Sequence, residues 1–113
     1  MATRYYISLP DTAKARASGE FAFRSQGADG LAQELQEVLR GDGLFQRWRT
    51  AQDDPDAVDP ALGATDPAAT VSGRQDDLHI DLVVVTSIPG AVFKQRLRLL
   101  AGSAWELRDV SSA

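Results

Sequence analysis

The residues best suited to chemistry form a short alternating run, Asp77-Leu78-His79-Ile80-Asp81. Successive side chains of a β-strand point to opposite faces, so a strand would place Asp77, His79 and Asp81 on one face. A histidine beside carboxylates can act as a general base or help to bind a divalent cation. His79 is the only histidine of the chain, which excludes a site that needs two histidines from one chain. The alternative is a solvated face at the start of a half-buried strand.

A second acidic group suggests a loop that offers hard oxygen ligands to Ca²⁺ or Mg²⁺. It consists of Asp53, Asp54, Asp56 and Asp59. Counted from Asp54, the EF-hand pattern fails, because its Gly position is occupied by Asp59 and its final Glu position by Thr65. The alternative is an ordinary charged loop in contact with water.

A third group is basic and suggests contact with an anion or a partner. It consists of Arg47, Trp48, Arg49, Arg96 and Arg98. An arginine beside an exposed tryptophan can contact a phosphate or stack with a nucleic-acid base. The aromatic residues that could stack on bases are Tyr5, Tyr6, Phe21 and Phe23. The net charge of -4 opposes binding to a polyanion, and a core position for Trp48 is the alternative.

The composition excludes several functional classes. The chain has 113 residues and no cysteine, so it has no thiolate nucleophile, no disulfide framework and no Cys-ligated metal centre. It contains no P-loop, dinucleotide-binding fingerprint or nucleophile elbow, and we expect no cofactor. The longest apolar run, Leu82–Val85, is far shorter than the ~20 residues of a membrane span. We therefore expect a soluble, cytoplasmic protein without a membrane partner.

Apolar residues make up 43% and charged residues 25% of the chain, which is typical of one small globular domain over residues 1–113. The charge is uneven, because residues 51–81 carry eight acidic residues and one basic residue. A long acidic loop is expected at about 51–69, with isolated helical turns at its Asp-Pro pairs. The bias towards Arg, Asp and Ala suggests a bacterial source with a GC-rich genome.

The hydrophobic pattern predicts an alternation of strands and helices. Strands are expected at Arg4–Leu9, Glu20–Ser25, Thr70–Gly73, Leu78–Ser87 and Trp105–Val110. The first helix carries Leu31, Leu35, Val38 and Leu39, with Asp29 as its cap and a left-handed Gly41 at its end. A short helix capped by Asp42 follows and carries Leu44, Phe45 and Trp48.

Residues 91–101 fit two structures. A helix would align Phe93, Leu97, Leu100 and Ala101, with Ser87 as its cap and Gly102 at its end. A strand would instead follow a turn at Pro89-Gly90. The many strong helix formers favour the helix.

This order predicts an α+β fold in which two helices pack on a single-layer antiparallel or mixed sheet, loosely ferredoxin-like. The alternative is one helix on a C-terminal β-meander. The leading functional hypothesis is a non-catalytic accessory module that binds a protein partner or forms a homodimer through an edge strand at 4–9 or 104–110. The alternatives are a small enzyme or a ligand or divalent-cation binder that uses His79 with Asp77 or Asp81, and an anion or nucleic-acid binder.

Overall fold

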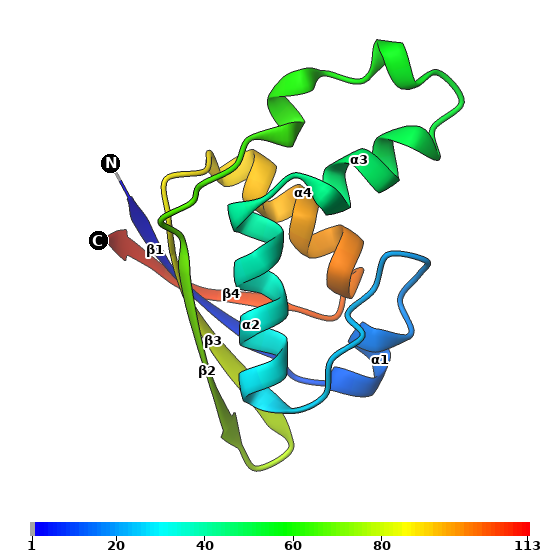
Figure 1. The fold of residues 1–113 in the computed structure, drawn as a ribbon. Helices are drawn as coiled ribbons and strands as arrows, with labels where there is room; N and C mark the ends of the chain where they lie inside the picture. The colour runs from blue at the N-terminus through cyan, green and yellow to red at the C-terminus, as the bar shows by residue number, and fades with distance from the viewer. Residues whose placement is uncertain (1) are drawn as a thin grey trace.

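The computed structural model describes residues 2–113 and has one sheet of four strands. The strands are β1 (Thr3–Leu9), β2 (Thr70–Asp76), β3 (His79–Thr86) and β4 (Glu106–Ser112). Their order in the sheet is β2-β3-β1-β4, and all neighbours are antiparallel (Figure 1). The predicted α+β fold with a single sheet is confirmed, and of the two sheet types that were predicted, antiparallel and mixed, the structure has the antiparallel one.

The longer helices connect strands that run in the same direction. β1 and β2 are both antiparallel to β3, so they are parallel to each other and need a crossover connection. That connection contains α1 (Thr12–Arg16), α2 (Gly27–Arg40), α3 (Gly43–Thr50) and two 3₁₀ turns. α4 (Gly90–Ala101) connects β3 to β4. α2 and α4 both lie on one side of the sheet, which leaves the other side open (Figure 1).

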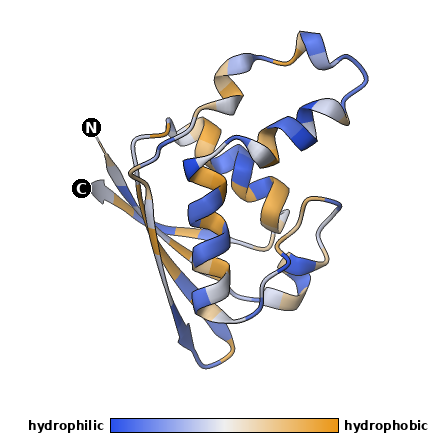
Figure 2. Cartoon of the chain, viewed as in Figure 1, coloured by the Kyte–Doolittle hydropathy of each residue, from blue (hydrophilic) through white to orange (hydrophobic). Residues whose placement is uncertain are grey.

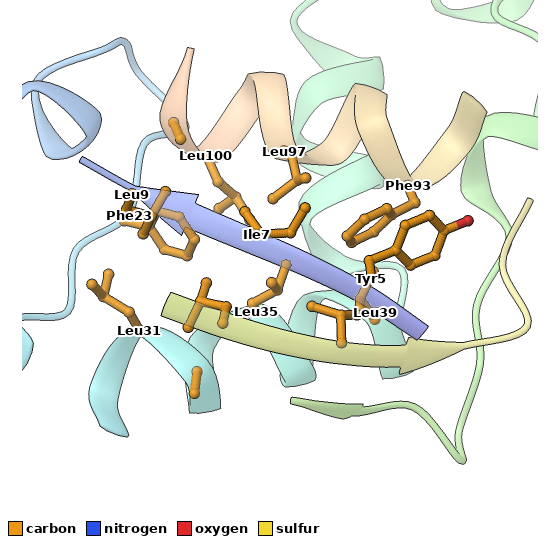
Figure 3. Close-up of a cluster of buried hydrophobic side chains, with 14 of the residues drawn as sticks. Tyr5, Ile7, Leu9, Phe23, Leu31, Leu35, Leu39, Phe93, Leu97 and Leu100 are labelled. Atoms are coloured by element: carbon orange, nitrogen blue, oxygen red, sulfur yellow. The ribbon is translucent and has the colours of Figure 1, made fainter. Parts of the chain in front are cut away.

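The core lies between the sheet and these two helices. Buried residues alternate along β1 and recur at helical spacing on α2 and α4; they are Tyr5, Ile7, Leu9, Leu31, Leu35, Leu39, Phe93, Leu97 and Leu100 (Figure 3). The Tyr5 and Phe93 rings are 4.4 Å apart between centroids. Burial of each large side chain stabilises the fold by about 1.5–3 kcal/mol. Because α4 spans Gly90–Ala101, the helical prediction for residues 91–101 is confirmed. Figure 2 shows hydrophobic and hydrophilic residues mixed along α2, as expected for a helix with one buried face.

The predicted strand at Glu20–Ser25 is wrong. β1 has β3 on one side and β4 on the other, so it offers no free edge to this segment. The Phe23 N–H donates to the Leu100 carbonyl at 2.8 Å instead, and the Ser25 N–H donates to the Glu34 carboxylate at 2.9 Å. The alternation that suggested a strand reflects burial of Phe23 against the helices.

Three of the predicted helix ends differ from the structure. α2 begins two residues before Asp29, which lies in its first turn and is not the cap. Gly41 has an extended backbone with φ of -129°, so the predicted left-handed stop is wrong there. Ser87 does not cap α4, since Pro89 precedes its first residue. Gly102 does end α4, with φ of 60°.

The hairpin of β2 and β3 is tighter than predicted. β2 extends to Asp76, and only Asp77 and Leu78 form the turn. Asp77 has φ of 57°, a left-handed conformation that aspartate tolerates better than most residues. Leu78 is 82% exposed and so does not continue the apolar face of β3.

β4 runs from Glu106 to Ser112, two residues beyond the predicted end, and contains a β-bulge. Leu107 pairs with Ile7 and Asp109 pairs with Tyr6, which leaves Arg108 as the extra residue. The bulge separates Leu107 from Asp109, which were expected on one face, and puts Leu107 on the face of Val110.

The acidic segment at 51–69 contains helical turns at two of its three Asp-Pro pairs, η1 (Pro55–Ala57) and η2 (Pro60–Gly63), and not at Asp66-Pro67. The segment projects from the body of the molecule (Figure 1). Arg96 of α4 holds the part of the segment that leads back to β2, which we call the return. It donates to the carbonyls of Leu62 (3.0 Å) and Ala64 in the segment, and to that of Val38 (3.3 Å) in α2. Arg96 is only 1% exposed.

Asp66 anchors the same return to the end of β3. Its carboxylate accepts from the Thr86 hydroxyl at 3.0 Å, from the Ser87 N–H at 2.9 Å and from the Ala68 N–H at 3.0 Å. Its own N–H donates to the Leu39 carbonyl at 2.8 Å, near the end of α2. The segment is thus tied to α2, β3 and α4 where it rejoins the sheet.

Within residues 2–113, none of the helices is long and apolar enough to cross a membrane.

Candidate functional site

The candidate site lies on the sheet face that the helices leave open. Alternation along β3 buries Ile80, Leu82 and Val84 and turns His79, Asp81 and Val83 to the other side. The strand register adds residues from β1 and β2 to this face; these are Arg4, Tyr6, Ser8, Ser72, Arg74 and Asp76. A shallow depression of about 940 Å³ lies over its centre and its hairpin end.

The hairpin places two carboxylates next to the only histidine. Asp76 pairs directly with His79 across the two strands, and Asp81 follows two residues later on the same face. The His79 Nε2 atom lies 3.4 Å from the Asp81 Oδ2 atom and 3.9 Å from the Asp76 Oδ2 atom. One ligand atom from each of the three residues can be chosen so that all lie within 4.8 Å of one another. We call Asp76, His79 and Asp81 the hairpin triad.

The triad is close to water and to two arginines. Its side chains are between 37% and 53% exposed. Arg74 lies 3.8 Å from Asp76, between the guanidinium nitrogen and the carboxylate oxygen. Arg108 and Glu106 of β4 line the same depression and pair with each other at 3.0 Å. The depression therefore has a carboxylate-rich hairpin and two guanidinium groups.

Sequence reasoning identified two members of the triad and missed the third. Asp77, which was predicted to act with His79, occupies the turn and is exposed. Asp76 was missed because the turn was expected to span Arg74–Asp77. A two-residue turn would have paired Asp76 with His79, but Val71 is the only large apolar residue of the segment 70–76, so no hydrophobic alternation extended the strand to Asp76.

The structure does not bring the ligand atoms of the acidic group in the 51–69 segment together. Within residues 2–113, the hairpin triad is the one group of three or more possible metal ligands at close range. Asp56 lies 3.4 Å from the Arg49 guanidinium, and Asp59 accepts from the Ala61 N–H at 2.9 Å. Asp53 and Asp54 are exposed.

The basic group does not form one patch. Arg96 is buried among carbonyl oxygens, and Arg49 donates to the Pro55 carbonyl at 3.0 Å. Trp48 is half-buried, with its ring centroid 6.1 Å from that of Phe45. Arg47 and Arg98 are exposed but line different hollows.

The aromatic residues also separate. Tyr5 and Phe23 are buried, and Phe21 packs against the core. Tyr6 lines the open-face depression. The structure therefore does not bring these four rings together as a stacking surface for bases.

Comparison with protein-family models, curated proteins and solved structures finds no match.

Proposed function

We propose that the open face of the sheet binds a divalent transition-metal cation through the hairpin triad. The observation that carries this proposal is the convergence of one imidazole and two carboxylates within 4.8 Å. Imidazole nitrogen favours metals such as Zn²⁺ over Mg²⁺ and Ca²⁺, while carboxylates bind either kind of ion. Two carboxylates and one neutral imidazole would compensate the charge of a divalent cation.

Three protein ligands leave coordination positions free for water or for a small anionic ligand. Arg74 and Arg108 border the same depression, and their charge would favour an anion beside the cation. The ligand atoms come from adjacent strands of one hairpin, so their spacing is set by the sheet rather than by a flexible loop.

The single histidine provides a direct test. In protein made without a histidine tag, the ring signals of His79 can be followed by NMR during titration with Zn²⁺. We expect these signals to shift and saturate, and Mg²⁺ at the same concentration to produce a much smaller effect. Unchanged His79 signals at millimolar Zn²⁺ would overturn the proposal.

Matched variants separate the triad from general acidity. Asp76→Asn and Asp81→Asn should each weaken Zn²⁺ binding at least tenfold by isothermal titration calorimetry, since each removes a charged ligand. Asp77→Asn removes the same charge from the adjacent turn and should leave the affinity within about twofold. Equal losses in all three variants would indicate nonspecific electrostatic attraction instead of a site.

We also propose a second function, a non-catalytic interaction module that binds a protein partner or a second copy of itself. The observation that favours it is the exposure of every residue of the edge strand β4. Exposed edge strands are surfaces that other chains can extend by hydrogen bonding. Analytical ultracentrifugation of the purified chain over a wide concentration range tests the self-associating form, which a strictly monomeric protein would contradict.

A further inference from the structure

The two edges of the sheet differ in how they are protected. At the β2 edge, the Val71 N–H donates to the Gln36 side chain of α2 at 3.0 Å. A Cβ atom on Gly73 would lie 2.5 Å from the Ala28 carbonyl oxygen, so α2 lies directly against this strand. At the other edge, β1 is the only element with which β4 makes extensive contact within residues 2–113. The β4 edge is therefore the one available for pairing.

β4 carries a self-complementary pattern. Leu107 and Val110 are 36% and 47% exposed and share one face because of the bulge at Arg108. Between them lie one basic and one acidic residue, Arg108 and Asp109. Glu106 and Ser111 flank this group on the open face.

We propose that two copies of the chain pair through antiparallel β4 strands around a two-fold axis between Arg108 and Asp109. Leu107 then lies opposite the partner's Val110, and Arg108 lies opposite the partner's Asp109. Each pair occurs twice, because the two-fold axis repeats it. The inference rests on the self-associating form of the second proposed function and adds the surface and the register.

Only this register matches faces and charges together. A shift of one residue in either direction places Val110 opposite the partner's Glu106 or the partner's Arg108. A shift of two residues in one direction places Glu106 opposite the partner's Asp109. A shift of two residues in the other direction places Val110 opposite the partner's Asp109. Like charges directly opposite each other are destabilising, as are mismatched faces.

The pairing would place the partner beside the open-face depression. Glu106 and Arg108 line the depression and also belong to the proposed interface. The partner's Asp109 would give Arg108 a second carboxylate in addition to Glu106. The dimer would thus extend the open face across an eight-stranded sheet.

The chain has no cysteine, so disulfide trapping can test the register without background. A double variant with Leu107→Cys and Val110→Cys should form a covalent dimer under mild oxidation, because opposite residues have Cβ atoms about 4.5–5.5 Å apart. Either single variant should remain monomeric on a non-reducing gel, since identical positions lie about 10 Å apart along the strands. An equimolar mixture of the two single variants should form the heterodimer.

A control variant with Leu107→Cys and Ser112→Cys reports the register shifted by two residues. If it crosslinks better than the Leu107–Val110 pair, the proposed register is wrong, although self-association stands. If ultracentrifugation finds only monomer at millimolar concentration, both the register and the self-associating function are overturned.

Charge reversal gives an independent test with a built-in rescue. Arg108→Asp places two aspartates opposite each other at both repeats of the pair and should raise the dimer dissociation constant at least tenfold. Asp109→Arg should do the same with two arginines. The double exchange restores opposite charges and should recover most of the affinity. Failure of this rescue, with the melting temperature of each variant unchanged, would contradict the proposed pairing.

Discussion

Within residues 2–113, Asp66 and Arg96 are the two buried residues with charged side chains. The Asp66 carboxylate accepts hydrogen bonds from a hydroxyl and from backbone N–H groups, and the Arg96 guanidinium donates to backbone carbonyls. The Ser87 N–H is the largest influence on Asp66 and lowers the pKa of its carboxyl below the ordinary value of 3.8; bonds from Thr86 and Ala68 act in the same direction and burial opposes them. Burial lowers the pKa of Arg96, and the negative charge of Asp42 partly opposes this.

The lowered pKa of Asp66 predicts that the folded chain loses stability in acid. Its pKa is lower in the folded chain than in the unfolded chain, so its contribution is complete above about pH 4 and disappears as the pH falls through the folded value. We expect the free energy of unfolding, measured with urea, to fall less steeply below about pH 4 in Asp66→Asn than in the native chain.

At neutral pH, Asp66→Asn should cost about 1–2 kcal/mol, because an amide accepts more weakly than a carboxylate. Asp53→Asn, at an exposed position of the same segment, is the matched control and should retain the native acid dependence. A native slope in Asp66→Asn would show that other carboxylates dominate acid unfolding.

The position of Arg96 illustrates what sequence can and cannot establish about a residue. Arg96 lies within the apolar arc of α4, three residues after Phe93 and one before Leu97, so the helical period already indicates burial. Its positive charge instead favoured a position on the surface, in contact with an anion or a partner. The acceptors that resolve this conflict lie at residues 38, 62 and 64, and no local pattern links them to position 96.

Among the elements, the 51–69 segment is expected to depend on Arg96 for its stable attachment to the rest of the fold. Arg96→Met retains much of the side-chain volume but leaves three carbonyl groups without their donor, and should lower stability by about 3 kcal/mol. Hydrogen exchange should accelerate in residues 52–65 more than in the sheet. Arg98→Met, on the exposed side of the same helix, should change stability by no more than about 0.5 kcal/mol. Equal stability of the two variants would contradict a clamping role for Arg96.

The packing of α2 on β2 depends on a glycine. Gly73→Ala would place a Cβ atom 2.5 Å from the Ala28 carbonyl oxygen, and backbone on both sides must move to relieve the overlap. We expect a loss of about 1–3 kcal/mol in thermal or urea unfolding. Gly43→Ala meets no atom within 4 Å and serves as the control, with stability unchanged or raised by about 0.4–1 kcal/mol. A neutral Gly73→Ala would show that the two elements are not tightly apposed.

Element types could be predicted where the periodicity was long and agreed with the propensities, as in α2, α4 and β3. The segment at 20–25 failed because its backbone partners are Leu100 and Glu34, which are distant in sequence. The hairpin triad was two-thirds predictable, since His79 and Asp81 share a strand face by alternation. Asp76 required the length of the turn, which depends on the left-handed backbone of Asp77.

At the scale of the whole molecule, the acidic residues divide into two regions. The 51–69 segment and the tip of the β2–β3 hairpin lie at opposite ends of the molecule (Figure 1). The net charge of -7 over residues 51–81 therefore does not form one acidic surface. Glu106 and Arg108 of β4 line the same depression as the hairpin triad, but none of the three triad residues lies on β4, so cation binding and self-association depend on different residues.

This separation predicts independent effects on global stability. A cation at one hundred times its dissociation constant stabilises the folded chain by about 2.7 kcal/mol, a rise in melting temperature on the order of 10 °C for a domain of this size. Arg108→Asp should retain this Zn²⁺-dependent rise in a thermal-shift measurement, whereas Asp81→Asn should lose most of it. Loss of the rise in Arg108→Asp would mean that the cation site needs the β4 strand.

The bulge at Arg108 has a consequence for how the length of this chain can vary. Arg108 has no partner on β1, so deleting it would join Leu107 to Asp109 and still leave every later residue on its present face. Deletion of Asp109 would have the same result, because Arg108 would then lie opposite Tyr6. In the part of β4 after the bulge, deleting one residue would turn the remainder of the strand over, since side chains alternate with a period of two. The bulge is therefore the place in β4 where a single-codon deletion preserves the phase of the strand, and homologous chains that differ by one residue in β4 are expected to differ there.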